Sequence, residues 1–279
     1  MSMPEYGSRS LWRATSGLDA TDARELAGRL ELRAKVQDEI EARAAYLDLL
    51  GVGEGDRVLD VGCGSGVVTR ELARRVGSTG RAVGVDPSPA FLAIARELAG
   101  AEGLGEGVEF REGSALALPF ADGAFDVTIA ATVLSHTPGG EAAIAEMARV
   151  VRPGGRVGVF DLDTDMTSIT HLDRALTRRI VAAASDATAV DGWLSRRLPL
   201  LFTRAGLLDV RVRGFFPLDT DPRGFYAGMM ERAADVAVTT GAITDAERRG
   251  WLDALHGAQE GGLVMAGRLH VFVWGGKPA

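Results

Sequence analysis

The stretch that decides the fold is VLDVGCGSG, residues 58–66. Its apolar first half predicts a buried strand, and its second half predicts a glycine-rich turn that opens a helix. Gly62, Gly64 and Gly66 let the backbone turn sharply and approach a ligand closely, because no Cβ stands in the way. The spacing is G-x-G-x-G, with Val at position 67, which counts against a dinucleotide-binding fingerprint. We therefore expect a small-molecule site at the end of this strand.

Outward from this turn, short apolar runs alternate with helical segments. The runs that predict strands are RVLDVG, RAVGVD, VEFREG, FDVTIAA, RVGVFDLD, LLDVRVRGFF and RLHVFVW. Strands that alternate with helices indicate βαβ units and right-handed crossovers. The chain is therefore predicted to be an α/β protein with a doubly wound, mostly parallel seven-stranded sheet. Ligands of such sheets bind beyond the carboxyl ends of the strands.

Helical segments flank this core and divide the chain. A capping-box pattern from Asp22 to Glu25 predicts an N-terminal helix that has a weak point at Gly28 and ends at Gly51. We expect residues 1–51 to form a helical lid, residues 52–220 and 263–279 the core, and residues 221–262 a helical insert. The insert should hold two helices, the first starting at Pro222 and the second capped by Thr244 and Glu247. It is predicted to cap an acceptor site, with plain packing as the alternative.

Composition narrows the possible partners. The 279 residues carry a formal net charge of −7, and the basic residues are almost all arginines without a cluster. Binding to nucleic acid or to an anionic membrane is therefore not expected. Cys63 is the single cysteine, so no disulfide within the chain is possible, and a cytoplasmic protein is the default expectation. A homodimer is possible. Glycine is abundant, at 36 residues, which indicates many defined bends or close approaches.

An acidic residue follows the next predicted strand. Asp86, in VGVDPS, lies 24 residues after Gly62, where a carboxylate can accept hydrogen bonds from both ribose hydroxyls of a nucleoside. Two later segments narrow this generic nucleoside site: GSALALPF at Gly113–Phe120 and EMARVVRPGG at Glu146–Gly155.

In this order and spacing, VLDVGCGSG, VGVDPS, LPFADGAFDV and RVVRPGG resemble the class I S-adenosylmethionine-dependent methyltransferases. The likeness is to their small-molecule branch, near the ubiquinone and menaquinone biosynthesis enzymes, and it covers about Val52–Asp161. It implies a Rossmann-like methyltransferase fold and S-adenosylmethionine or S-adenosylhomocysteine as cofactor. The helical insert departs from the short hairpin common in that branch.

The same resemblance assigns cofactor contacts. It implies that Asp60 and the glycine turn hold the methionine part, that Asp86 holds the ribose, and that Pro87 and Ser88 lie beside the adenine. Ser114 and Ala115 should flank its other side, although many relatives have Asp at position 114. The expected cofactor-binding residues are Asp60, Gly62, Cys63, Gly64, Ser65, Gly66, Asp86, Pro87, Ser88, Ser114, Ala115 and Ala131.

His136 is the candidate catalytic residue. It lies just beyond the fourth strand, where the transferred methyl group should point, and an imidazole is suited to take a proton from a hydroxyl acceptor. A structural hydrogen-bonding role is the alternative. His171 could also face the site, whereas His256 and His270 are expected on the surface or in packing. Asp161, Asp163 and Asp165 alternate along a strand end and raise the possibility of Mg²⁺, but caps and solvated acids are the favoured interpretation, so no metal is predicted.

The acceptor is predicted to be small and largely apolar, natural-product-like or quinone-like, with O-methylation slightly ahead of C- or N-methylation. A second hypothesis keeps the fold and cofactor but replaces methyl transfer by a cyclisation, elimination or rearrangement. The least favoured hypothesis is a non-enzymatic, cofactor-sensing protein. Apolar and aromatic candidates for the acceptor pocket are Tyr6, Trp12, Phe215, Phe216, Phe225, Tyr226, Met229 and Met230.

Overall fold

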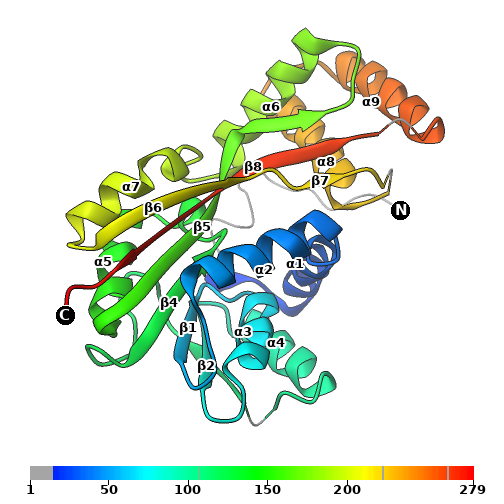
Figure 1. The fold of residues 1–279 in the computed structure, drawn as a ribbon. Coiled ribbons are helices and arrows are strands. Elements are labelled where there is room, and N and C mark those ends of the chain that lie inside the picture. The colour runs from blue at the N-terminus through cyan, green and yellow to red at the C-terminus, as the bar shows by residue number, and fades with distance from the viewer. Residues whose placement is uncertain (1–14, 106, 222, 263) are drawn as a thin grey trace.

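A computed structural model describes residues 15–105, 107–221, 223–262 and 264–279. Within these residues an eight-stranded sheet has the order β3-β2-β1-β4-β5-β8-β6, and β7 adds to β8 (Figure 1). The strands are β1 (Arg57–Val61), β2 (Arg81–Asp86), β3 (Val108–Glu112), β4 (Phe125–Ala131), β5 (Val151–Ile169), β6 (Leu208–Phe215), β7 (Leu218–Asp219) and β8 (Ala266–Gly276). The first five run parallel, and β8 pairs antiparallel with β5 and β6. The seven strands expected from sequence are thus confirmed, and the two-residue β7 is additional.

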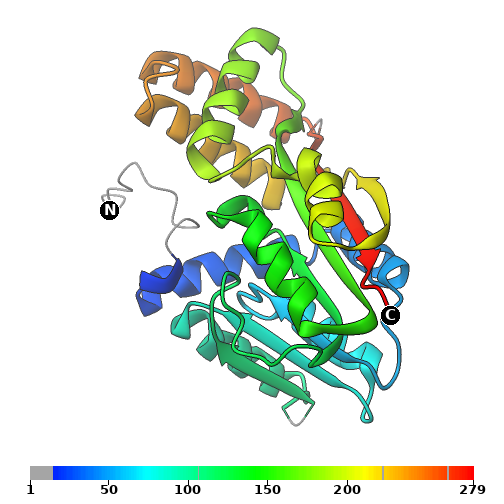
Figure 2. The same cartoon turned by 90° about the vertical axis from the view of Figure 1, so that its left-hand side faces the viewer.

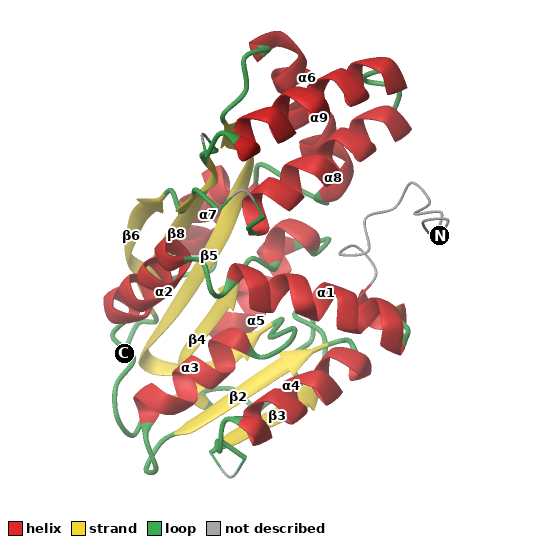
Figure 3. Cartoon of the chain, turned by 90° about the vertical axis from the view of Figure 1, so that its right-hand side faces the viewer, coloured by secondary structure: helices red, strands yellow, loops and turns green. Residues whose placement is uncertain are grey.

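Helices cover both faces of the sheet. They are α1 (Ala20–Arg33), α2 (Gln37–Leu50), α3 (Val67–Val76), α4 (Pro89–Ala101), α5 (Gly140–Val150), α6 (Arg174–Thr188), α7 (Leu194–Arg204), α8 (Phe225–Thr239) and α9 (Asp245–Glu260), with short 3₁₀ turns η2 (Thr15–Gly17) and η3 (Leu134–His136). One apolar cluster joins α2 and α3 to the sheet, and another joins α5 and α7 to it. Figure 3 shows α1 to α4 toward the viewer, in front of the strands. Burial on both faces explains why β1, VLDV after its exposed Arg57, is continuously apolar except for Asp60.

The winding direction reverses between β1 and β4. From β1 the chain proceeds outward through β2 to β3, and it then returns to β4 on the other side of β1. A switch of this kind leaves a crevice at the carboxyl ends of the two central strands, because the connections leave in opposite directions. Asp60 and Ala131 are at or next to those ends, and Asp86 closes the neighbouring β2.

Beyond the crevice, β5 and β8 continue far past their neighbours and carry a helical layer. Figures 1 and 2 show α6, α8 and α9 stacked at this end. Ile180, Met230 and Trp251, one from each of the three helices, are fully buried in a shared apolar cluster. β5 runs on to Ile169, and α6 begins at Arg174, after the Asp173 cap. The first helix of the insert begins at Phe225, and the capping box of Thr244 and Glu247 is confirmed.

The N-terminal segment contains two helices where one was expected. Asp19, not Asp22, caps α1, because its carboxylate accepts hydrogen bonds from the amides of Thr21 and Asp22. Gly28 lies inside α1, and the helix instead ends at Arg33. The break at residues 34–36 is closed by turn hydrogen bonds. No helix in the described part of the chain is long and apolar enough to cross a membrane.

Candidate active site

The glycine turn after β1 adopts a backbone that only glycine accepts easily. Gly62 and Gly64 have φ angles of +73° and +51°. The amide of Gly62 donates to the carbonyl of Val85 on β2 over 2.7 Å, which fixes the turn to the neighbouring strand. A Cβ at Gly62 would lie 2.5 Å from the side chain of Val133. The turn is therefore wedged between β2 and the segment that follows β4.

Two buried carboxylates support this turn. Asp86 accepts the amides of Gly64 and Ser88, each over 2.9 Å and each on a different oxygen. Asp60 accepts the hydroxyl of Thr69 over 2.6 Å. Burial raises the pKa of Asp60 to about 7, with a further increase from Asp86, and it also raises the pKa of Asp86. Each carboxylate keeps a lone pair on its bonded oxygens for a ligand, since a carboxylate oxygen can accept more than one hydrogen bond.

A cavity of about 330 Å³ opens beside the turn and collects most of the predicted cofactor residues. Its lining includes Asp60, Gly62, Cys63, Gly64, Ser65, Asp86, Pro87, Ser114, Ala115, Ala131 and His136. Gly66 and Ser88 are not among the lining residues. Gly66 is the N-cap of α3, packed beside Phe110, and the Ser88 hydroxyl caps α4 by accepting the amide of Phe91. In the structure both residues cap the N-terminus of a helix.

The far wall of the cavity is the segment after β4. His136 ends the short turn η3 and lines the cavity. The preceding Ser135 donates both its amide and its hydroxyl to Asp161 on β5, over 3.0 and 2.7 Å. Burial raises the pKa of Asp161, and the bonds from Ser135 oppose that increase. Asp161 thus supports the segment that carries His136.

Helix α1 covers the glycine turn. Glu31 accepts the hydroxyl of Ser65 and the guanidinium of Arg70, both over 2.8 Å. Leu30 lies so close to Gly64 that a Cβ there would be 2.9 Å from its Cδ1. Leu30 and Arg33 of α1 line the cavity, so this helix forms part of its wall.

Several lining residues were missed from sequence. Arg33, Glu39, Arg43 and Tyr46 come from α1 and α2, and Phe160 comes from β5. The first four belong to an amphipathic segment that was expected to form one helix. Which of its side chains face the cavity could not be predicted without knowing that the helix breaks after Arg33. The structure shows Glu39 and Tyr46 to be buried and Arg33 and Arg43 half-buried, which the sequence alone does not reveal.

The apolar residues proposed for an acceptor pocket do not line this cavity where the structure describes them. Tyr226 and Met230 are fully buried, and the Tyr226 hydroxyl donates to Glu39 over 2.6 Å. Met229 packs against the cluster of the helical layer, and the ring of Phe215 lies 5.9 Å from that of Phe160. Phe216 is exposed. Tyr6 and Trp12 lie outside the described residues.

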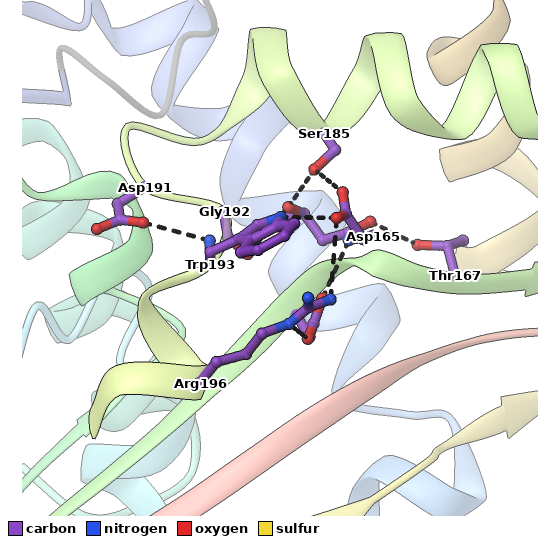
Figure 4. Close-up of polar contacts among 9 residues, drawn as sticks. Asp165, Thr167, Ser185, Asp191, Gly192, Trp193 and Arg196 are labelled. Atoms are coloured by element: carbon purple, nitrogen blue, oxygen red, sulfur yellow. Dashed lines mark hydrogen bonds and ion pairs between the residues drawn. The ribbon is translucent and has the colours of Figure 1, made fainter. Parts of the chain in front are cut away.

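The carboxylates beyond Asp161 are occupied by protein partners (Figure 4). Arg196 holds Asp163 through two hydrogen bonds of 2.5 and 2.9 Å. Asp165 accepts the indole N–H of Trp193 over 2.6 Å and the hydroxyl of Ser185 over 2.7 Å. Within the described ranges no group of His, Cys, Asp and Glu side chains is arranged to hold a metal. We call Asp163, Asp165, Ser185, Trp193 and Arg196 the junction network, because it joins β5 to α6 and α7.

The remaining histidines do not line the cavity. His171 stacks on Trp251 with ring centroids 4.8 Å apart, and its Nε2 is 3.1 Å from the Trp251 carbonyl. His256 pairs with Glu231 at the surface, and His270 is buried and stacks on Phe160 at 4.9 Å. Packing and surface roles were the expectation for the last two.

The strand order, the glycine turn after β1 and the carboxylate after β2 are those expected of a class I methyltransferase domain. Residues 58–155 match the family model described as a methyltransferase domain. This part of the chain is therefore a domain of that family, and the chain resembles the small-molecule enzymes of ubiquinone and menaquinone biosynthesis.

Three relatives illustrate the likeness. Methyltransferase GfsG of Streptomyces halstedii is 37% identical over 158 residues, which are 57% of this chain and 55% of that protein. The ubiquinone/menaquinone biosynthesis C-methyltransferase UbiE of Hahella chejuensis is 37% identical over 115 residues, 41% of this chain and 46% of that one. The solved structure of the YcgJ protein from Bacillus subtilis superposes with a TM-score of 0.60 at 18% identity and covers 86% of this chain and 99% of that one. The chain thus matches about half the length of these two curated relatives.

Proposed function

We propose that this protein transfers a methyl group from S-adenosylmethionine to a small, largely apolar acceptor of natural-product or quinone-like character. One observation carries the proposal: a single cavity joins the glycine turn and Asp86 to the segment that bears His136. Cofactor-binding groups and a candidate acid–base group therefore face the same space. The wall includes Val67, Val68 and Phe91 among its apolar residues, which suits the adenosyl and thioether parts.

The residues fit the cofactor in shape and in hydrogen-bonding capacity. The absence of a Cβ at Gly62 and Gly64 keeps the turn close to its neighbours and leaves its backbone beside the cavity. Asp86 would accept hydrogen bonds from the ribose hydroxyls, and Asp60 would accept one from the ammonium group of the methionine part. Ser114 and Ala115 would flank the adenine. The bound cofactor supplies an activated methyl group on a sulfonium. The protein then has to align the acceptor in line with that group and exclude water.

His136 would act as the general base for a hydroxyl acceptor. It lines the cavity on the segment after β4, and Ser135 and Asp161 hold that segment in place. Removal of the hydroxyl proton as the new bond forms raises the nucleophilicity of the oxygen. This role is the reason to favour O-methylation over C- or N-methylation.

Calorimetric titration with S-adenosylhomocysteine and S-adenosylmethionine tests the proposal directly. We expect saturable binding of both, and a purified, folded protein that binds neither would refute the function. Turnover of phenols and naphthoquinols should release S-adenosylhomocysteine in equal amount. Conversion of an acceptor without that release would instead favour a cyclisation, elimination or rearrangement.

A His136→Ala variant separates catalysis from structure. General-base catalysis typically contributes about 100-fold or more to the rate, so kcat should fall by at least that factor. Affinity for S-adenosylhomocysteine should stay within about threefold of wild type. Equal losses in turnover and cofactor affinity would assign His136 a structural role.

A further inference from the structure

Charged side chains from the N-terminal helices line the cavity alongside the glycine turn. Arg33 is the last residue of α1, and Glu39 and Arg43 are four residues apart on α2. Residues four apart on a helix lie on the same face, so Glu39 and Arg43 point to the same side. All three line the cavity, together with Tyr46.

The single carboxylate in this group already has partners within the protein. Glu39 is 4% exposed, and its Oε1 accepts the Tyr226 hydroxyl over 2.6 Å and lies 3.7 Å from Nε of Arg33. Burial alone would raise the pKa of Glu39, but Arg33, His270 and the Tyr226 hydroxyl outweigh it, so the pKa lies below its usual value. Glu39 is therefore ionised and provides one negative charge.

Arg33 has a second contact that fixes its position. Its two terminal nitrogens lie 3.2 and 3.3 Å from the hydroxyl of Thr132, which also lines the cavity. Thr132 has a φ angle of +58°, a conformation that a β-branched residue adopts only when its surroundings enforce it. Its amide donates to the carbonyl of Phe160 over 2.6 Å. The guanidinium is thus anchored at the cavity wall from two sides.

Arg43 adds a positive charge that no carboxylate balances. Its guanidinium donates a hydrogen bond to the carbonyl of Ala34 over 3.3 Å. Across the described ranges no carboxylate lies within ion-pair distance of Arg43, although its charge reaches Glu39 and Tyr46. Asp60 and Asp86 line the same cavity, but in the described residues neither forms an ion pair with Arg33 or Arg43. Asp86 accepts the amides of Gly64 and Ser88, and Asp60 accepts the hydroxyl of Thr69. Two guanidiniums therefore share one carboxylate, and the remaining positive charge favours an anion.

We propose that Arg33 and Arg43 form a carboxylate-binding site in this cavity. A guanidinium presents a planar fork of donors that matches a carboxylate, and such charge-assisted hydrogen bonds are among the stronger ones in proteins. The carboxylate belongs either to the amino-acid end of the cofactor or to the acceptor. The inference rests on the proposed function for its ligands, and it extends that function by assigning an anionic group that the sequence motifs do not predict.

Titration of three probes into wild type and an Arg43→Gln variant distinguishes the two sources. The probes are S-adenosylhomocysteine, 5′-methylthioadenosine, which lacks the amino-acid end, and benzoate, which is titrated with and without S-adenosylhomocysteine. If the cofactor supplies the carboxylate, the variant should bind S-adenosylhomocysteine about tenfold or more weakly and 5′-methylthioadenosine unchanged. If the acceptor supplies it, only benzoate binding should be lost. An Arg43→Lys variant should recover part of either loss.

Controls keep a structural explanation apart from recognition. Arg211 is an exposed arginine on β6, so Arg211→Gln removes the same charge away from the cavity and should bind all three probes as wild type does. Arg33→Lys, which keeps a cation beside Glu39, should weaken the same probes as Arg43→Gln but by a smaller factor, as Arg43→Lys does. Equal weakening of S-adenosylhomocysteine and 5′-methylthioadenosine, or no change with any probe, would overturn the carboxylate site. A wild type that binds no S-adenosylhomocysteine would refute the proposed function, and its benzoate titration would still test the arginines.

Discussion

Two groups of strand ends on the same side of the sheet are held together in different ways. At the carboxyl ends of β1 and β2, main-chain groups form the site: glycines with positive φ, and amides that donate to Asp86. At the outer end of β5, side chains of the junction network do the same task, as Asp163 pairs with Arg196 and Asp165 with Trp193. A site made from backbone demands particular residues at fixed spacing and so leaves a motif. A network made from side chains leaves none.

The largest expected effect breaks the backbone-built end. In Gly62→Ala the new Cβ would lie 2.5 Å from Val133, and the residue would also have to keep a φ of +73°. We expect a destabilisation of about 3 kcal/mol or more, from overpacking and the left-handed backbone together. S-adenosylhomocysteine affinity should fall at least 100-fold. Denaturant unfolding and calorimetry measure the two effects.

Gly103→Ala is the matched control. Gly103 has a φ of +74°, almost the angle of Gly62, but a Cβ there would meet nothing within 4 Å. The free energy of unfolding of this variant should fall by about 1 kcal/mol from backbone strain alone. Its affinity for S-adenosylhomocysteine should equal that of wild type. Similar losses in both variants would mean that strain, and not the contact with Val133, governs the turn.

The sequence was sufficient to predict the glycine turn and insufficient to predict the N-terminal helices that cover it. The glycine turn and Asp86 are short-range patterns, and the structure brings them together as expected. The end of α1 at Arg33 is not local information. Gly28 is a weaker helix former than Arg33, yet the helix continues through Gly28. It ends at Arg33, which contacts Thr132, 99 residues further along the chain. The contacts of Arg43 and Glu39 depend on that break, so tertiary packing decided what local propensity could not.

Asp60 gives the backbone-built end a pH dependence. Its carboxyl has an ordinary pKa near 3.8 when unfolded and about 7 in the folded protein, because it is buried. A raised pKa favours the folded state at low pH, so this contribution is complete below about pH 4 and is lost as the pH rises to about 7. Asp60→Asn should remove it. The difference in unfolding free energy, wild type minus variant, should fall by up to about 4 kcal/mol from pH 4 to pH 7.

Urea unfolding of both proteins at several pH values measures this difference. S-adenosylhomocysteine should reduce the slope for wild type, because a bound ammonium favours the ionised carboxylate and releases its proton. A constant difference between the two proteins across this range would show that Asp60 ionises as easily folded as unfolded.

A smaller effect is expected at the side-chain-built end. Arg196→Gln would leave Asp163, which is 2% exposed, without its two charge-assisted hydrogen bonds. Because Arg196 itself is partly exposed, we expect a loss of about 2 kcal/mol, below the full cost of a buried unpaired charge. Cofactor affinity should not change, since neither residue lines the cavity.

The neighbouring Arg197 provides the control for that substitution. It is more exposed and pairs at the surface with Asp191, so Arg197→Gln should cost about 0.5 kcal/mol or less. Thermal unfolding ranks the two variants. If Arg197→Gln cost more than Arg196→Gln, the buried pair of Asp163 and Arg196 would not be the stronger of the two. A loss of cofactor affinity in Arg196→Gln alone would mean that the junction network influences the cavity.

The smallest expected effect is that of a chelator. Asp161, Asp163 and Asp165 alternate along β5 in a way that can bind Mg²⁺, yet each accepts hydrogen bonds from protein groups. A metal would have to displace the Ser135 hydroxyl, the Arg196 guanidinium or the Trp193 indole, and only the guanidinium of these three donors is charged. The Arg196 pairing is the decisive one, because a cation cannot join Asp163 without expelling another. We therefore expect EDTA to leave turnover and unfolding temperature unchanged, whereas a loss that Mg²⁺ restores would mean that the junction network rearranges around a metal.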